Sequence, residues 1–209
     1  MICVSLAGIS FQECVKLMAK TEFAEIRIDQ LDLSDSQFSS LFAMKKKSIA
    51  TCRPGKDDDQ RLALLKLAIE SGAGYVDVEY ESEATFRTEL LNYAHAHNIM
   101  VIISYHNFEC TPSSKELNQI IDQSFHWGAD RVKITTTATS QSDCARIMSL
   151  YENYKNLIAF CMGKIGTITR VAAPFLGAEF TYAAISKTLA TAPGQITYEG
   201  LIDVYEVIK

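Results

Sequence analysis

The feature that most constrains this chain is an eightfold alternation of short strand-like runs with helical segments. The runs are rich in apolar, β-branched and aromatic residues, and the segments between them have the 3.6-residue periodicity of amphipathic helices. The runs cover residues 2–6, 24–29, 48–53, 75–80, 100–106, 131–135, 157–162 and 180–184, and residues 197–209 are expected to form a closing helix. Strands that alternate with helices pair in parallel through right-handed crossovers. The pattern therefore predicts an α/β protein, a (β/α)8 TIM barrel that forms a single domain over residues 1–209.

The alternative is an open, doubly wound sheet. That fold would be expected to have a glycine-rich, phosphate-binding turn after the first strand, and the lone Gly8 does not form such a motif. Each βα unit would span about 26 residues, which is near the lower size limit of a TIM barrel. Helix starts are predicted by three capping-box pairs and by an acidic cluster that suits the positive end of a helix dipole. These are Ser10 with Glu13, Ser34 with Gln37, Ser113 with Glu116, and residues 57–59.

Charge and hydropathy exclude several classes of protein. The net charge of -5 argues against a nucleic-acid partner, because duplex binders concentrate a basic excess on one face. The basic run at residues 45–47 is expected to be a solvated helix end. No apolar stretch reaches the length that a membrane span needs, and the first residues lack the basic region of a signal peptide. We expect a cytoplasmic protein without a membrane partner.

The six cysteines predict neither a disulfide framework nor a structural metal. They are scattered without a CxxC pair, and no histidine lies at zinc-finger spacing from them. His95, His97 and His126 fall near predicted helix ends, where an imidazolium complements the dipole. We therefore expect no metal site.

Charged residues follow one face of several predicted strands. Alternation places Glu25, Arg27 and Asp29 on one side of their run, opposite Ile26 and Ile28. The outer face of a barrel must be apolar to pack under the helices, so the charged face is expected to point inward. The inward groups are three cations, four carboxylates and a histidine: Arg27, Arg53, Lys133, Glu25, Asp29, Asp77, Glu79 and His106. Structural ion pairs account for some of them, and a polar active site accounts for the whole set, since unpaired buried charges are costly.

Lys133 is the candidate nucleophile. On its own it fits a surface lysine of an edge strand as well as an amine in a prepared cavity. In a cavity, burial and nearby cations lower the pKa of a lysine, and the neutral amine can attack a carbonyl to form a Schiff base. His106 ends the preceding run, where an imidazole could move protons near neutral pH.

Two polar loops follow the last two runs. The first, MGKIGTITR, ends in Arg170, and the second, TAPGQ, covers residues 191–195. Arginine offers a fork of donors that matches a carboxylate, and Thr and Gln add neutral hydrogen bonds. On composition alone, Arg170 fits a surface helix residue equally well.

The motifs VSLAG, EIRID, TCRP, SYHNF, VKIT, MGKIGTITR and APGQI occur in this order over nearly the whole chain. This set resembles the type I 3-dehydroquinate dehydratases of the shikimate pathway of aromatic amino-acid biosynthesis. The resemblance implies a (β/α)8 barrel that uses no cofactor or metal and acts on the small molecule 3-dehydroquinate. It implies an imine between the lysine and the C3 ketone, followed by syn elimination of the C1 hydroxyl to give 3-dehydroshikimate. Dimers occur in the family, so a homodimer is expected as well.

The resemblance also implies roles for individual residues. Lys133 would be the nucleophile, His106 the general base and acid, and Asp57 the carboxylate that orients the histidine. Arg170 would grip the substrate carboxylate with help from Gln195 and Thr191. The rest of the substrate-binding set would be Ser5, Glu25, Ile26, Arg27, Arg53, Met162, Tyr182 and Ala192. The family pattern has glutamate where this chain has Asp57 and serine where it has Thr191.

Two alternatives stay open. Another class I Schiff-base lyase or aldolase on the same barrel would also use an inward lysine, although a phosphosugar aldolase should show a glycine-rich phosphate site after the last two strands. A catalytically inactive barrel that serves as a binding module would be expected to lose the lysine, the histidine or the arginine. Lys133, His106 and Arg170 are all present.

Overall fold

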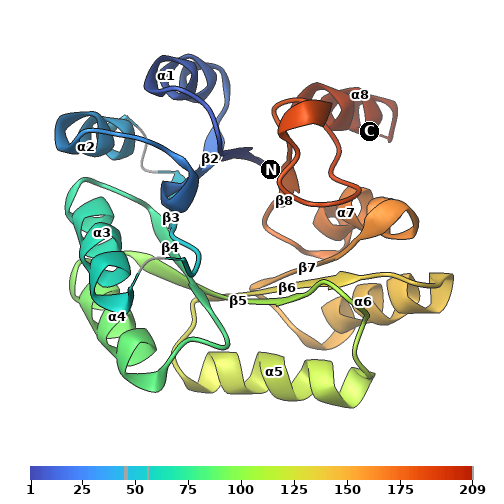
Figure 1. The fold of residues 1–209 in the computed structure, drawn as a ribbon. Helices are drawn as coiled ribbons and strands as arrows, with labels where there is room; N and C mark the ends of the chain where they lie inside the picture. The colour runs from blue at the N-terminus through green and yellow to red at the C-terminus, as the bar shows by residue number, and fades with distance from the viewer. Residues whose placement is uncertain (45–46, 56, 209) are drawn as a thin grey trace.

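The computed structural model describes residues 1–44, 47–55 and 57–208, and these residues form a parallel barrel ringed by helices (Figure 1). The strands are β1 (Ile2–Leu6), β2 (Phe23–Arg27), β3 (Ser48–Thr51), β4 (Tyr75–Glu79), β5 (Met100–Asn107), β6 (Arg131–Thr137), β7 (Leu157–Met162) and β8 (Thr181–Ala183). The helices are α1 (Phe11–Lys20), α2 (Asp35–Ala43), α3 (Asp58–Glu70), α4 (Ala84–Ala96), α5 (Ser114–His126), α6 (Gln141–Asn153), α7 (Gly163–Leu176) and α8 (Tyr198–Ile208), with short 3₁₀ turns η1 (Ile28–Gln30) and η2 (Lys187–Leu189). The predicted (β/α)8 barrel is confirmed.

All strand pairs are parallel, in the order β7-β6-β5-β4-β3-β2-β1-β8. Within the described residues no ladder joins β7 to β8, so the barrel is nearly closed, with one seam there. The helix α7 crosses close beside this seam, where a side chain on Gly166 would lie 2.6 Å from Cβ of Cys161. In the described part of the chain no helix is long and apolar enough to cross a bilayer.

The strand ends differ from the prediction by at most two residues. The second run was expected to extend to residue 29, but β2 ends at Arg27 and η1 follows. The carboxylate of Asp29 folds back and accepts two hydrogen bonds from the guanidinium of Arg27, at 2.8 and 3.0 Å. It also accepts a hydrogen bond from the backbone amide of Arg53. This turn therefore ends the strand where the pocket begins. Of the predicted basic helix end at residues 45–47, only Lys47 lies within the described residues, and it is exposed.

The predicted helix caps are confirmed. The hydroxyl groups of Ser10, Ser34 and Ser113 each accept a hydrogen bond from the backbone amide three residues later. The side chain at that later position accepts in return from the backbone amide of the serine. Ser140 forms a fourth such box with Asp143. The closing helix begins at Tyr198, one residue later than expected, and is described to Ile208.

The two faces of the sheet have different roles. The outer face carries aliphatic side chains such as Leu6, Ile26, Val78 and Ile103, which are buried under the helices. The inner face begins at the amino ends of the strands with an apolar layer built around Phe23, Tyr75 and Phe180. Beyond this apolar layer, toward the carboxyl ends of the strands, the inward side chains become polar. For example, the register places Ser104 of β5 beside Lys133 of β6. The charged residues are therefore concentrated toward the carboxyl ends of the strands.

Candidate active site

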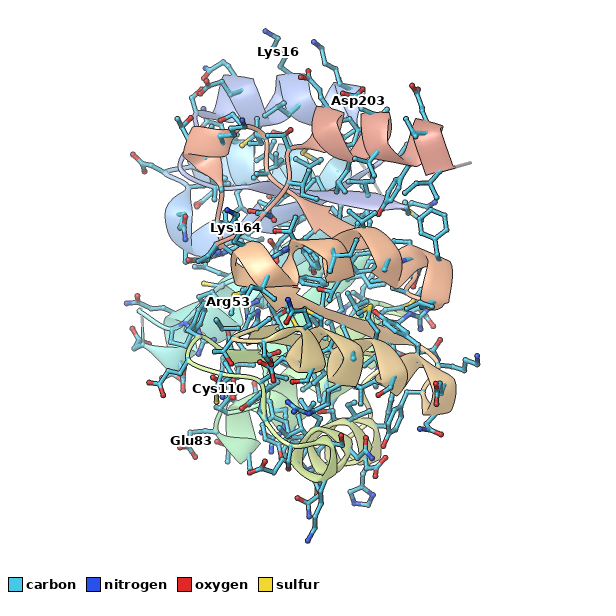
Figure 2. All side chains as sticks on the ribbon, turned by 90° about the vertical axis from the view of Figure 1, so that its right-hand side faces the viewer. Lys16, Arg53, Glu83, Cys110, Lys164 and Asp203 are labelled. Atoms are coloured by element: carbon cyan, nitrogen blue, oxygen red, sulfur yellow. The ribbon has the colours of Figure 1, made fainter. Side chains whose placement is uncertain are left out.

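A cavity of about 440 Å³ opens at the carboxyl ends of the strands. In Figure 2 the labelled Arg53, Cys110 and Lys164, which follow β3, β5 and β7, lie toward this same end of the barrel. Active sites of (β/α)8 barrels lie at this face, because the loops that follow the strands meet there. The following predicted residues line the cavity: Ser5, Glu25, Arg27, Arg53, His106, Lys133, Met162, Arg170, Tyr182, Thr191, Ala192 and Gln195.

Lys133 lies deep in this cavity, with 6% of its side chain exposed. Its Nζ is 3.6 Å from Oδ2 of Asp77, 3.9 Å from Oε1 of Glu25, and 4.4 Å from the ring centre of Tyr182. Burial lowers the pKa of the Lys133 ammonium, the two carboxylates oppose this effect, and Arg53 adds to it. The net result is a lowered pKa, which raises the fraction of neutral amine.

The two carboxylates below Lys133 are held by their own partners. Glu25 accepts from Oγ of Ser5 at 2.8 Å and from Oγ1 of Thr51 at 3.1 Å. Oδ1 of Asp77 accepts from Ser104 at 2.6 Å and from Arg53 at 2.8 Å, whereas its Oδ2 has no hydrogen-bond partner among the described residues. Burial raises the pKa of Asp77, but Arg53 and Lys133 outweigh it and hold this pKa well below its usual range. Asp77 is therefore a fixed negative charge beside the amine.

His106 ends the inward face of β5, where it pairs in register with Thr135, two residues after Lys133 on β6. Burial lowers its pKa well below the ordinary value, Lys133 and Arg53 lower it further, and Asp77 opposes them. Its ring stacks on Phe108 with 6.1 Å between ring centres, and it makes no hydrogen bond to any described residue. A neutral imidazole that faces the pocket can accept a proton from a bound molecule.

Arg170 is buried without an anionic partner. It comes from α7, it is 1% exposed, and its Nε and Nη2 have no hydrogen-bond partner among the described residues. Its guanidinium carbon lies 4.4 Å from the ring centre of Phe160, and burial lowers its pKa to about 10. A buried cation that lacks a partner is costly, so this geometry fits an anion that arrives with the ligand.

The loop after β8 closes the same side of the cavity. Oε1 of Gln195 accepts from the amide and the hydroxyl of Thr191, at 2.8 and 3.1 Å. The amide of Gly163, at the start of α7, donates to the carbonyl of Pro193 at 3.1 Å. The loop that carries Thr191 and Gln195 is thus fastened to the helix that carries Arg170.

Two predicted site residues are not brought to the cavity. Asp57 was expected to orient His106, but it caps α3, where Oδ1 accepts from the amide of Gln60 at 2.9 Å. The free amide at the helix start competes successfully for this short side chain. Ile26 was expected to bind substrate, but its side chain is fully buried on the outer face of β2, as the alternation with Glu25 requires.

Several lining residues were not among the predicted site residues: Gln30, Pro54, Glu79, Glu81, Phe108, Thr135 and Phe160. Strand alternation places Thr135 on the same face as Lys133, and it places Glu79 inward, but neither residue was given a role. Glu81 and Phe108 come from loops, where no period applies. In the part of the chain that the structure describes, no three His, Cys, Asp or Glu side chains are grouped as metal ligands.

A (β/α)8 barrel with a buried amine, a neutral imidazole and a buried arginine in one pocket defines a class: barrel enzymes that act through a lysine on a small anionic molecule. The comparisons with known proteins are specific. Residues 2–209 match the family described as Type I 3-dehydroquinase. The 3-dehydroquinate dehydratase of Desulfotalea psychrophila is 33% identical, and the match covers 98% of this chain and 96% of that protein.

The 3-dehydroquinate dehydratase of Pyrococcus abyssi is 34% identical, over 100% of this chain and 98% of that protein. The crystal structure of the 3-dehydroquinate dehydratase from Aquifex aeolicus is similar with a TM-score of 0.85 and 28% identity, over 99% of this chain and 98% of that chain. This chain belongs to the type I 3-dehydroquinase family.

Proposed function

We propose that this member of the family is a 3-dehydroquinate dehydratase, a lyase that converts 3-dehydroquinate into 3-dehydroshikimate and water with Lys133 as its Schiff-base nucleophile. The family match over almost the whole chain supports the reaction. It also disfavours the two alternatives, a different class I lyase or aldolase and an inactive binding barrel.

The covalent step begins with the neutral amine of Lys133. Its Nζ attacks the C3 ketone, a carbon–nitrogen bond forms, and the ketone oxygen leaves as water to give an iminium ion. The positive nitrogen acidifies the adjacent C2 proton, which Nε2 or Nδ1 of His106 removes. The electron pair forms the C1–C2 double bond while the C1 hydroxyl departs as water with the proton from His106. Hydrolysis of the product imine then consumes one water and regenerates Lys133.

The charges around Lys133 favour these reaction steps. Asp77 and Glu25, at 3.6 and 3.9 Å from Nζ, stabilise the positive nitrogen of the iminium. Burial and the nearby arginines lower the pKa of the amine, which favours its neutral form. The lowered pKa of His106 keeps its imidazole neutral and ready to accept the C2 proton.

The substrate is held at its other end by Arg170. Its unpartnered Nε and Nη2 match the two oxygens of the C1 carboxylate, and Gln195 and Thr191 lie in the same wall. The cavity is also lined by Arg27, Arg53, Glu25 and Ser5, which supply donors and acceptors for the ring hydroxyls, and by the side chains of Met162, Tyr182 and Ala192. Asp57 and the side chain of Ile26 have no place in this proposal.

The observation that carries the proposal is that one cavity holds both a buried amine and a buried, unpartnered guanidinium. A keto acid needs both groups, whereas a phosphosugar would not need a single buried arginine of this kind. The same proposal includes one domain over the chain, a cytoplasmic location, a homodimer, and catalysis without a cofactor. The domain and the location rest on the length, strand pattern and hydropathy of the sequence, and the homodimer and the absence of a cofactor rest on the family resemblance.

The test is turnover of 3-dehydroquinate, followed by the ultraviolet absorbance of the conjugated product. We expect the purified protein to form 3-dehydroshikimate. Arg170→Met should lower kcat/KM by a factor of about 100 or more, mostly through KM, because the carboxylate loses a charge-assisted pair of hydrogen bonds. An active protein whose KM is unchanged by this substitution would contradict the role of Arg170, and a protein with no turnover would contradict the proposed reaction.

A further inference from the structure

Arg61 lies on α3, outside the barrel, and it reaches through to a carboxylate of the pocket. Only 4% of its side chain is exposed. Its Nη2 donates to Oε2 of Glu79 at 2.6 Å, its Nη1 to Oδ1 of Asp58 at 2.7 Å, and its Nε to the carbonyl of Cys52 at 3.1 Å. The guanidinium also lies over the ring of Phe86, 4.7 Å from its centre. All three nitrogens are thus used, and the side chain is fixed in one orientation.

Glu79 is the link between Arg61 and the pocket. One oxygen, Oε2, accepts from Arg61 and from Ser82 at 3.2 Å. The other, Oε1, accepts from Nη1 of Arg53 at 2.8 Å. The carboxylate is therefore shared between an arginine outside the barrel and an arginine that lines the cavity.

Arg53 is anchored through one nitrogen. Its Nη1 donates to Glu79 and to Asp77, each at 2.8 Å, and to Ser104 at 3.1 Å. Its Nε and Nη2 make no hydrogen bond to any described residue, and the side chain is 18% exposed in the cavity. Nε and Nη2 are therefore the donors available to a ligand. Their direction depends on where Glu79 and Asp77 hold Nη1.

We propose that Arg61 is a positioning residue for substrate binding: through Glu79 it sets the orientation of the Arg53 guanidinium that faces the ring hydroxyls. The inference rests on the proposed function, because it assigns Arg53 to the substrate. Without Arg61, Oε2 of Glu79 loses its charged partner, and the carboxylate turns both oxygens toward Arg53 or toward water. Either change moves the donors of Arg53, and small displacements of a binding group are enough to weaken binding strongly.

The hydrogen bond from Arg61 to the Cys52 carbonyl has a second effect on the binding residue. Cys52 directly precedes Arg53, so the bond from Arg61 Nε to the Cys52 carbonyl holds the backbone from which Arg53 departs. The side chain and the backbone of the binding residue are thus fixed by the same guanidinium. This explains why a helix residue that does not line the cavity is buried with three polar partners.

The chain offers a matched control in Arg146 on α6. Arg146 also pairs with an aspartate three residues earlier, Asp143 at 2.9 Å. It also donates to loop carbonyls, those of Thr111 and Pro112, although these belong to the loop between β5 and α5. It reaches no carboxylate of the cavity and does not line it. Arg146→Met therefore removes a similar set of loop bonds without the link to the pocket.

The experiment compares KM and kcat for 3-dehydroquinate in Arg61→Met, Arg61→Lys and Arg146→Met, with folding checked by circular dichroism. We expect Arg61→Met to raise KM by about 10-fold or more, with a smaller change in kcat. Arg61→Lys should give an intermediate KM, because an ammonium keeps the charge but cannot reach all three acceptors together. Arg146→Met should leave KM unchanged. If Arg61→Met does not fold, the KM of Arg61→Lys decides by the same criterion.

A double-mutant comparison shows whether Arg61 acts through Arg53. In an Arg53→Lys background, Arg61→Met should change KM by less than about 2-fold, because the group that it positions is already altered. The inference is overturned by an unchanged KM in the Arg61 variants, by an equal rise in Arg146→Met, or by the full effect persisting in the Arg53→Lys background. Absence of turnover by the unmodified protein would instead overturn the proposed function, and this inference with it.

Discussion

At the scale of the residue, burial adjusts both groups that carry the proposed chemistry. Lys133 and His106 are cationic when protonated, so removal from water lowers the pKa of each. Asp77, whose Oδ2 lies 3.6 Å from Nζ of Lys133, opposes this effect for both residues. The site therefore combines an amine that loses its proton more easily with an imidazole that remains neutral.

The state of His106 gives a direct test. Because its pKa is lowered, the ring should stay neutral as the pH falls through the ordinary value of 6.5 and take up a proton only below it. A histidine ring titration by NMR, assigned with His106→Asn, should show this resonance moving below pH 6.5. His106→Asn should also lower kcat by a factor of about 10² to 10⁴. A ring that titrates above pH 6.5 would contradict the account of its surroundings.

At the scale of the element, the loop after β8 and the first turn of α7 form one unit. Gly194 has φ +73°, and a Cβ there would lie 2.4 Å from the carbonyl oxygen and 2.8 Å from the carbonyl carbon of Gly163. Both contacts are with backbone, which cannot turn aside as a flexible side chain can. The close approach is possible only with glycine, and it brings Gln195 and Thr191 to the same wall as Arg170.

Gly194→Ala should therefore displace the loop and weaken substrate binding. We expect KM for 3-dehydroquinate to rise by about 10-fold or more, as Gln195 and Thr191 move from the cavity. Gly128→Ala is the control, because Gly128 also has a positive φ of 105° but lies before β6, at the opposite end of that strand from the cavity, with its nearest contact at 3.8 Å. Gly128→Ala should lose about 1 kcal/mol of stability to backbone strain, and Gly194→Ala should lose more, because its Cβ also meets the Gly163 backbone; chemical denaturation measures both. A raised KM in Gly128→Ala alone would contradict this account.

At the scale of the whole molecule, the sequence allowed the barrel and most of the site to be predicted, because both depend on periodic burial. The alternation that puts Ile26 under the helices puts Glu25 and Arg27 inside, and the same rule locates Lys133 and His106. The same rule does not extend to loops, so Glu81 and Phe108 were not predicted, and Asp57, which was predicted at the site, caps α3 and does not line the cavity.

Arg61 shows a second limit of sequence reasoning. It lies on a helix with no motif around it, and only the packing of α3 against β4 brings its guanidinium to Glu79. A side-chain contact between two different elements leaves no periodic signal in either of them. Such residues are found from coordinates, even where the residues that they hold can be predicted.

The most direct test of the central claim is reductive trapping of the imine. The protein is mixed with 3-dehydroquinate and sodium borohydride, and its intact mass and peptide map are measured. We predict a stable adduct of reduced ligand on Lys133 with parallel loss of activity, and neither adduct nor turnover in Lys133→Ala. An adduct on another lysine, or a Lys133→Ala protein that still forms 3-dehydroshikimate, would contradict the role of this amine.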